Sequence, residues 1–224
     1  LVNKDNELLC YYYQRRLSAS DKTALTDARS LWSTPTSMPD SCTPIFQALI
    51  SSGQISQQDI WTRIRAALEE GQTAVATHVN RYLTDNDVLN SADLNNAAKN
   101  PQRYLETLKS KIKTRSDREI VLFALLRLLR NDTNQAYVQW LKIKDQLTAS
   151  DRSYFLGRLG YRAAMRHDSR APDWFREAQN TAQPYPPSDT VLAWQVRAAL
   201  RATNWDEVLK TINRMSPAEQ QVDT

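Results

Sequence analysis

The sequence predicts an all-α fold, a right-handed superhelix of stacked antiparallel helical hairpins with a degenerate tetratricopeptide-like pattern. Apolar residues recur at helical spacing along most of the chain. Glycine is scarce, with 4 residues in 224, as expected where few tight β-turns or phosphate-binding loops are needed. The turn-forming pairs Asn131-Asp132, His167-Asp168 and Thr203-Asn204 recur every 36 residues, each between two expected helices. A unit of about that length is typical of helix–turn–helix repeats.

Helices are expected throughout the first part of the chain, separated by short turns. Thr43-Pro44 has the pattern of an N-cap followed by proline in the first turn, and Gly53 ends that helix. The segment 87–98 is polar and rich in asparagine, so it has few side chains to bury. The expected helices cover 7–17, 21–32, 44–52, 56–70, 72–83 and 87–98.

The second part of the chain continues the pattern, starting from a cap and proline at Asn100-Pro101. Ser116 and Glu119 fit a capping box. The helix behind it, Ile120–Leu126, is apolar nearly all round, so it must be covered on several sides. Glycines inside a helix lower its stability, and we therefore expect Gly157 and Gly160 to mark close helix packing.

Length and charge leave the domain count and the partner class open. We expect one α-superhelical domain over 1–224, for which a sub-division into 1–99 and 100–224 also fits the pattern. The start at Leu1 without Met, and a last helix that opens at Ser216-Pro217, are typical of a piece of a longer protein. The net charge of +4 is spread over the chain, as on solvated helix faces, although it would also attract a polyanion. No apolar run is long enough to span a membrane.

Motifs for metal or catalytic chemistry are missing from the sequence. His78 and His167 lie far apart, and no His and Cys spacing fits zinc. Glu69 and Glu70 are adjacent, so they point to different helix faces and make a poor acid–base pair. No catalytic residue, metal site or cofactor is therefore expected.

One stretch of the chain concentrates positive charge. It could hold the carboxylates of a peptide or a phosphate polymer, or it could be a solvated linker between helices. Its residues are Lys109, Lys111, Lys113, Arg115 and Arg118.

Both cysteines lie near the start of the chain. Cys10 falls on the first expected helix, and Cys42 directly precedes the third. Two cysteines flanking a helical hairpin could meet if the hairpin folds back on itself, but buried free cysteines are also common. The residues alone therefore leave a disulfide and a pair of buried thiols open.

The surroundings of the cysteines carry a resemblance to a known family. The chain has the order Leu8-x-Cys10-x-Tyr12-Tyr13, then Leu31-Trp32, then Pro39-x-x-Cys42-x-x-x-Phe46. This order resembles the start of the helical superhelix of the soluble lytic transglycosylases, which cleave the glycan strands of bacterial peptidoglycan. Beyond Gly53 the resemblance thins to a repeat-like helical pattern.

The resemblance implies that Cys10 and Cys42 form a disulfide, and hence an exported, periplasmic protein. It implies a superhelix that holds or guides murein strands for a lysozyme-like domain C-terminal to it. That domain cleaves the linkage between N-acetylmuramic acid and N-acetylglucosamine to a 1,6-anhydro product, without a cofactor. The family's catalytic Glu-Ser pair and its Gly-Leu-Met-Gln run are missing here, so this chain alone is expected to be inactive.

Two other functions fit the same helical pattern. A tetratricopeptide-like scaffold would bind a protein partner along its helices. A basic helical array could bind RNA, but no base-reading position recurs from unit to unit, so we expect no nucleic-acid partner.

Overall fold

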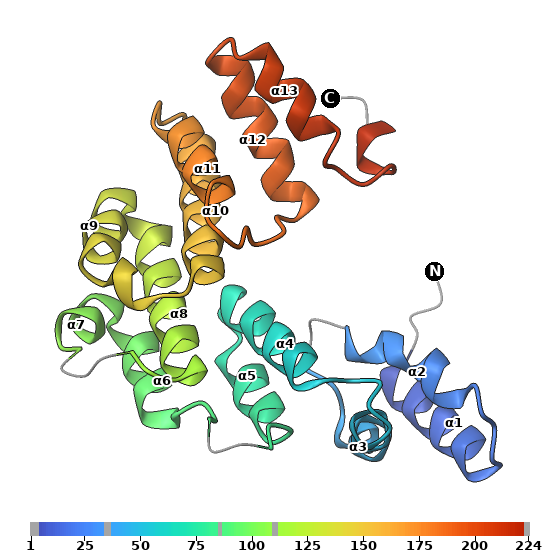
Figure 1. Cartoon of the computed structure of the whole chain (residues 1–224). Coiled ribbons are helices and arrows are strands. Elements are labelled where there is room, and N and C mark those ends of the chain that lie inside the picture. Colours follow the sequence, from blue (N-terminus) through green and yellow to red (C-terminus); the bar gives the residue numbers. More distant parts are fainter. Residues whose placement is uncertain (1–4, 34–36, 85–86, 109–111, 222–224) are drawn as a thin grey trace. The chain divides into compact units, whose positions relative to one another are not determined.

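The structure is a computed structural model that describes residues 5–33, 37–84, 87–108 and 112–221 (Figure 1). Within these residues the regular structure is helical and no strand occurs, which confirms the predicted all-α fold class. The chain divides into two compact units, Leu1–Ser91 and Ala92–Thr224. The sequence analysis expects a single domain and leaves open a sub-division between 99 and 100. None of the described helices is both long and apolar enough to cross a membrane.

The helices of the first unit follow one another closely along the chain. Helix α4 begins with a reciprocal cap, in which Ser56 and Asp59 each accept a backbone N–H of the other. Gly53 and Gly71 follow α3 and α4 with positive φ angles of 74° and 78°, the conformation that glycine adopts most readily at a helix end. The elements are α1 (Asn6–Ser18), α2 (Ala24–Trp32), the 3₁₀ turn η1 (Asp40–Cys42), α3 (Thr43–Ser51), α4 (Gln57–Glu69) and α5 (Thr73–Asn80).

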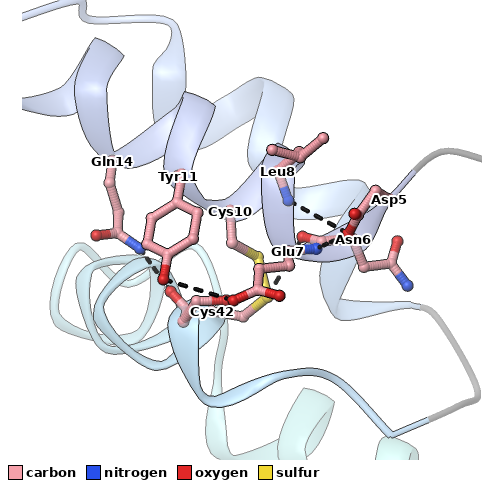
Figure 2. The surroundings of a disulfide bond; sticks show 9 residues. Asp5, Asn6, Glu7, Leu8, Cys10, Tyr11, Gln14 and Cys42 are labelled. Carbon is pink, nitrogen blue, oxygen red and sulfur yellow. Dashed lines mark hydrogen bonds between the residues drawn. A yellow bond between two sulfur atoms is a disulfide. The ribbon is translucent and has the colours of Figure 1, made fainter.

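A disulfide between Cys10 and Cys42 fastens α1 to the turn η1 that leads into α3, as Figure 2 shows. Both residues are fully buried, and their Cα atoms lie 4.9 Å apart. Beside the bond, the side-chain amide of Gln14 donates a hydrogen bond to the backbone carbonyl of Ser41. The bond closes the loop that contains α2, so the opening stretch of the sequence is held together covalently.

A buried arginine of the first unit packs against two aromatic rings. The guanidinium carbon of Arg63 lies 4.7 Å from the ring centroid of Trp32 and 5.3 Å from that of Phe46. Tyr82 contacts both of these rings edge-on, at 5.7 and 6.2 Å. Arg63 is 8% exposed, and its Nε and Nη1 atoms have no hydrogen-bond partner. The π faces of these rings therefore supply the attraction that a carboxylate would otherwise give, and burial lowers the pKa of Arg63.

The second unit is a series of antiparallel helix pairs, seen in Figure 1 as α8 with α9, α10 with α11, and α12 with α13. Its elements are α6 (Ser91–Lys99), α7 (Pro101–Glu106), α8 (Arg115–Asn131), α9 (Thr133–Ile143), η2 (Lys144–Gln146), α10 (Ala149–Met165), α11 (Ala171–Gln179), α12 (Asp189–Arg201), α13 (Trp205–Ile212) and η3 (Glu219–Gln221).

Helix α8 is covered on several sides, as its apolar sequence predicts. Every side chain from Glu119 to Leu125 is buried, and α7, α9 and α10 all pack against the helix. The predicted capping box at Ser116 and Glu119 is wrong, because both residues lie inside the helix and are buried. Thr114 caps α8 instead, and Asp117 completes the box. The helix begins one residue before Ser116.

Two of the turns between paired helices have the same backbone geometry. His167 and Thr203 have left-handed φ angles of 57° and 53°, which are uncommon for residues with a Cβ atom. In both turns the next residue donates its N–H back into the preceding helix, to Ala163 and to Ala199. This bonding satisfies carbonyls that the helix end would otherwise leave without a partner.

Arginines from one helix pair reach the carbonyls of the pair before it. Arg166 Nη2 donates to the carbonyl of Arg130 at 2.8 Å, and Arg201 Nη1 donates to that of Ala164 at 3.4 Å. Both carbonyls lie near a helix C-terminus, where positive charge is favourable. These contacts stabilise the stacking of successive pairs and could not be read from the local sequence.

The two glycines of α10 differ in their surroundings. A Cβ atom at Gly160 would lie 2.9 Å from the Cδ1 atom of Phe175, so this glycine does allow close packing between α10 and α11. A Cβ atom at Gly157 would meet nothing within 4 Å. The expectation of close packing is therefore right for Gly160 and wrong for Gly157.

Loss of the disulfide should destabilise the first unit. The bond joins residues 32 apart, and closing a loop of that length removes about 3–4 kcal/mol of unfolded-state entropy in the chain-entropy model. We expect the Cys10→Ala/Cys42→Ala variant to lose a similar free energy of unfolding in urea denaturation. A reductant should destabilise the wild type and leave the variant unchanged. A loss below about 1 kcal/mol would contradict the role given to the bond.

Alanine should have opposite effects at the two glycines of α10. Gly157→Ala should raise the free energy of unfolding by about 0.5–1 kcal/mol, because alanine is the better helix former and its methyl group meets no atom. Gly160→Ala should lower it by about 1–3 kcal/mol, because the ring of Phe175 must shift. Thermal and urea unfolding measure both changes, and a shift of the same sign in both variants would refute the packing described here.

Candidate functional site

A polar cavity of about 600 Å³ lies in the second unit, between α6, α7 and α8. Ligand pockets commonly have volumes in this range. Its described lining residues all belong to the second unit. We call it the α6–α8 pocket; it is lined by Asp93, Asn96, Lys99, Asn100, Arg103, Tyr104, Thr107, Leu108, Ile112, Asp117 and Val121.

Helix caps fix the backbone around the α6–α8 pocket. Asn100 caps α7 as predicted, with its Oδ1 accepting the N–H of Arg103 at 3.0 Å. Asp117 Oδ2 accepts the N–H groups of Lys113 and Thr114, both at 3.0 Å. Burial works against the charge on Asp117, but these hydrogen bonds outweigh it, so the pKa of this carboxyl is lowered.

Tyr104, on α7, is the half-buried aromatic residue of the α6–α8 pocket. Burial is the largest cause that raises its pKa, and the carboxylates of Asp93 and Asp117 raise it further. Its hydroxyl therefore keeps its proton well above neutral pH and can both donate and accept hydrogen bonds.

The remaining polar groups suit a ligand rich in hydroxyl, amide and carboxylate groups. Asn96 offers an amide with donors and an acceptor, and Lys99 and Arg103 offer charged donors; all three side chains are exposed. Val121 is fully buried and, with Leu108 and Ile112, gives the pocket an apolar part. The arrangement can bind and orient a polar molecule.

Acid catalysis requires a carboxyl group whose pKa is raised so that it stays protonated. Asp117 is shifted the other way and is ionised near neutral pH. Among the described residues, no group of three or more His, Cys, Asp or Glu side chains is placed to hold a metal ion.

The structure places only part of the predicted basic cluster. Lys109 and Lys111 lie outside the described residues, and the side chain of Lys113 is exposed. Arg115 forms an ion pair with Glu119 at 3.4 Å, and Arg118 forms one with Asp151 at 3.0 Å. Two of the five charges are therefore engaged within the chain, and ligand binding by the cluster stays a prediction.

The other predicted site residues, Cys10 and Cys42, are buried in the first unit and have a structural role. Sequence reasoning missed the α6–α8 pocket. Its signal was the asparagine-rich segment 87–98, whose polar side chains left the helix with little to bury.

No protein-family model matches this sequence, and no curated protein matches it. Solved structures do. The chain is similar to an inactive mutant of the lytic transglycosylase Slt from Pseudomonas aeruginosa, with a TM-score of 0.67 and 23% identity over 97% of this chain. A complex of a 70-kDa soluble lytic transglycosylase with bulgecin A has a TM-score of 0.51 and 19% identity over 97% of this chain.

These likenesses show that the chain has a soluble lytic transglycosylase-like fold, which confirms at the level of fold the resemblance in the opening stretch of the sequence. The chain covers 35% of the length of each of these enzymes, about a third.

The raised pKa of Tyr104 should be visible in an alkaline titration. Its phenol should ionise above the usual value of about 10, so the stability it contributes is complete below that pH and is lost as the pH rises toward its own pKa. We expect Tyr104→Phe to remove a late phase of phenolate absorbance and to flatten the loss of stability above pH about 10. Tyr12→Phe, at an exposed ring of the other unit, controls for the loss of one phenol. An unchanged late phase in Tyr104→Phe would contradict this assignment.

Proposed function

We propose that this chain is the non-catalytic helical region of a soluble lytic transglycosylase and that it holds peptidoglycan strands. The observation that carries the proposal is the fold: 97% of the chain aligns with the P. aeruginosa enzyme. The Cys10–Cys42 bond adds support, because it fits the resemblance in the opening stretch. A structural disulfide also suits an oxidising compartment, and we propose a periplasmic location.

The α6–α8 pocket is the part of the chain best suited to contact murein. Peptidoglycan carries hydroxyl and acetamido groups on its sugars and carboxylates on its stem peptides. Asn96 can pair with an acetamido group, and Lys99 and Arg103 can pair with carboxylates. Tyr104 adds an aromatic surface with a hydroxyl at its tip.

The chemistry of strand cleavage belongs, in this proposal, to a lysozyme-like domain C-terminal to this chain in the parent protein. That domain would cleave the linkage between N-acetylmuramic acid and N-acetylglucosamine to a 1,6-anhydro product without a cofactor. Hydrogen bonds lower the pKa of Asp117, the half-buried carboxyl of the α6–α8 pocket, whereas a general acid needs a raised pKa. The chain by itself should bind murein and leave it intact.

One observation favours a second candidate, a scaffold that binds proteins. Helix α13 exposes two large apolar side chains one turn apart, Trp205 at 64% and Leu209 at 63%. Exposed aromatic and aliphatic side chains in one place are typical of protein contacts. This candidate predicts saturable binding to a protein and no binding to murein.

Co-sedimentation with purified murein sacculi tests the proposal. We expect the chain to sediment with sacculi and the Asn96→Ala/Arg103→Ala variant to bind about tenfold more weakly, because both lost groups face the pocket. Lys210→Ala, at an exposed position on α13, is the matched control and should bind like the wild type. Failure of the wild type to sediment with sacculi would overturn the proposal. Release of anhydro-muropeptides would overturn its non-catalytic part.

A further inference from the structure

Gly157 has no structural reason to be glycine. It lies inside α10, where glycine costs about 0.5–1 kcal/mol relative to alanine. The positive-φ glycines among the described residues are Gly53 and Gly71, so a left-handed backbone does not require glycine here. Close packing does not require it either, because an added Cβ atom would meet nothing within 4 Å. What the missing side chain leaves is open space on one face of α10.

That space is part of a groove between α10 and the segment that leads into α12. The groove has a volume of about 210 Å³, and it adjoins a smaller hollow of about 30 Å³ that shares Gly157 and Val191. We call it the Gly157 groove; its main lining residues are Tyr154, Gly157, Arg158, Tyr185, Pro187 and Val191. All of them belong to the second unit.

The wall of the Gly157 groove is held rigidly in place. The hydroxyl of Ser153 accepts the backbone N–H of Tyr185 at 2.8 Å and donates to the carbonyl of Ala178 at 2.8 Å. The ring of Tyr154 packs edge-on against that of Tyr185, with centroids 4.9 Å apart. Prolines at 184, 186 and 187 restrict the backbone on both sides of Tyr185. A groove fixed before binding loses little conformational entropy when a ligand enters.

The lining has two chemical parts. Tyr185, Pro187 and Val191 form an apolar wall. Arg158 and Ser188 lie at the polar part, and Ser188 makes no capping hydrogen bond although it is the N-cap of α12. A sugar ring has the matching pattern, with C–H groups on one face and hydroxyl groups around its edge. Aromatic side chains with a polar tip suit such a ligand.

We propose that the Gly157 groove is a second saccharide site that takes a single pyranose ring. The inference rests on the proposed function, because that function supplies the glycan as the ligand. The inference goes beyond the proposed function, because it places a second glycan contact on α10 and α12, separate from the α6–α8 pocket. The groove's volume of about 210 Å³ suits a small ligand, and glycine at 157 leaves open space in the groove at a cost to helix stability.

A titration followed by NMR on the ¹⁵N-labelled full chain, with tri-N-acetylchitotriose as the probe, tests the inference. We expect saturable shifts of the amides of Gly157 and Val191, in addition to shifts in α6 and α7. The Gly157→Leu variant should fill the groove, and its Cβ atom has no neighbouring atom within 4 Å. This variant should abolish the shift of the Val191 amide and leave the shifts in α6 and α7 unchanged.

A second variant covers the case in which leucine disturbs the helix. Arg158→Gln keeps the groove open and should raise the Kd measured at Val191 about tenfold. Arg162→Gln, one turn further along α10 and outside the groove, should leave that Kd unchanged.

The outcomes separate this inference from the proposed function. Shifts confined to α6 and α7 would overturn the Gly157 groove as a saccharide site and leave the proposed function standing. Shifts at Gly157 with a proline-rich peptide but none with the saccharide would also overturn it, in favour of a peptide site. No shift anywhere with the saccharide would overturn the Gly157 groove as a saccharide site, whereas the proposed function is overturned only if the chain fails to sediment with sacculi.

Discussion

Helix α8 has buried side chains all around its circumference between Ile120 and Leu125, so it must be covered by neighbours on several sides. Helices α7, α9 and α10 provide that cover, and α10 in turn packs against α11 and α12. The need to cover α8 therefore accounts for the packing of these helices in the second unit. A charged residue in the middle of α8 would leave an unpaired charge among apolar side chains. It should therefore disturb the packing of α7, α9 and α10 on this helix.

The candidate pocket depends on the same helix. Val121 lines the pocket from one side of α8, and Asp117 stands in its first turn. The cap formed by Thr114 and Asp117 fixes where α8 starts, and it therefore fixes the edge of the pocket. The pocket's polar side chains come mainly from α6 and α7, and α7 packs directly against α8. In this way one apolar helix serves both the stability of the unit and the geometry of the candidate site.

Sequence patterns predicted most of the helices because the signals that start and end a helix lie within a few residues of its ends. The cap and proline at Asn100-Pro101 and the glycine at 53 are such signals, and apolar spacing marks the helices between them. They predicted the burial of α8 because its composition allows no exposed face. They failed where the deciding contact is distant in sequence. Arg118 pairs with Asp151. At Gly160, unlike at Gly157, the side chain of Phe175 from α11 lies against the position of an added Cβ atom. The α6–α8 pocket was missed for the same reason, since three helices have to meet before its polar side chains converge.

Hydrogen–deuterium exchange of the chain, with and without a soluble murein fragment, tests the central claim most directly. Without the fragment, the amides of α8 should exchange most slowly in the second unit, since this helix opens only with the unit as a whole. With the fragment, exchange should slow in α6 and α7, which line the pocket. Rapid exchange in α8 would contradict its role in the fold. Unchanged exchange in α6 and α7 at saturating fragment would contradict the role of the pocket.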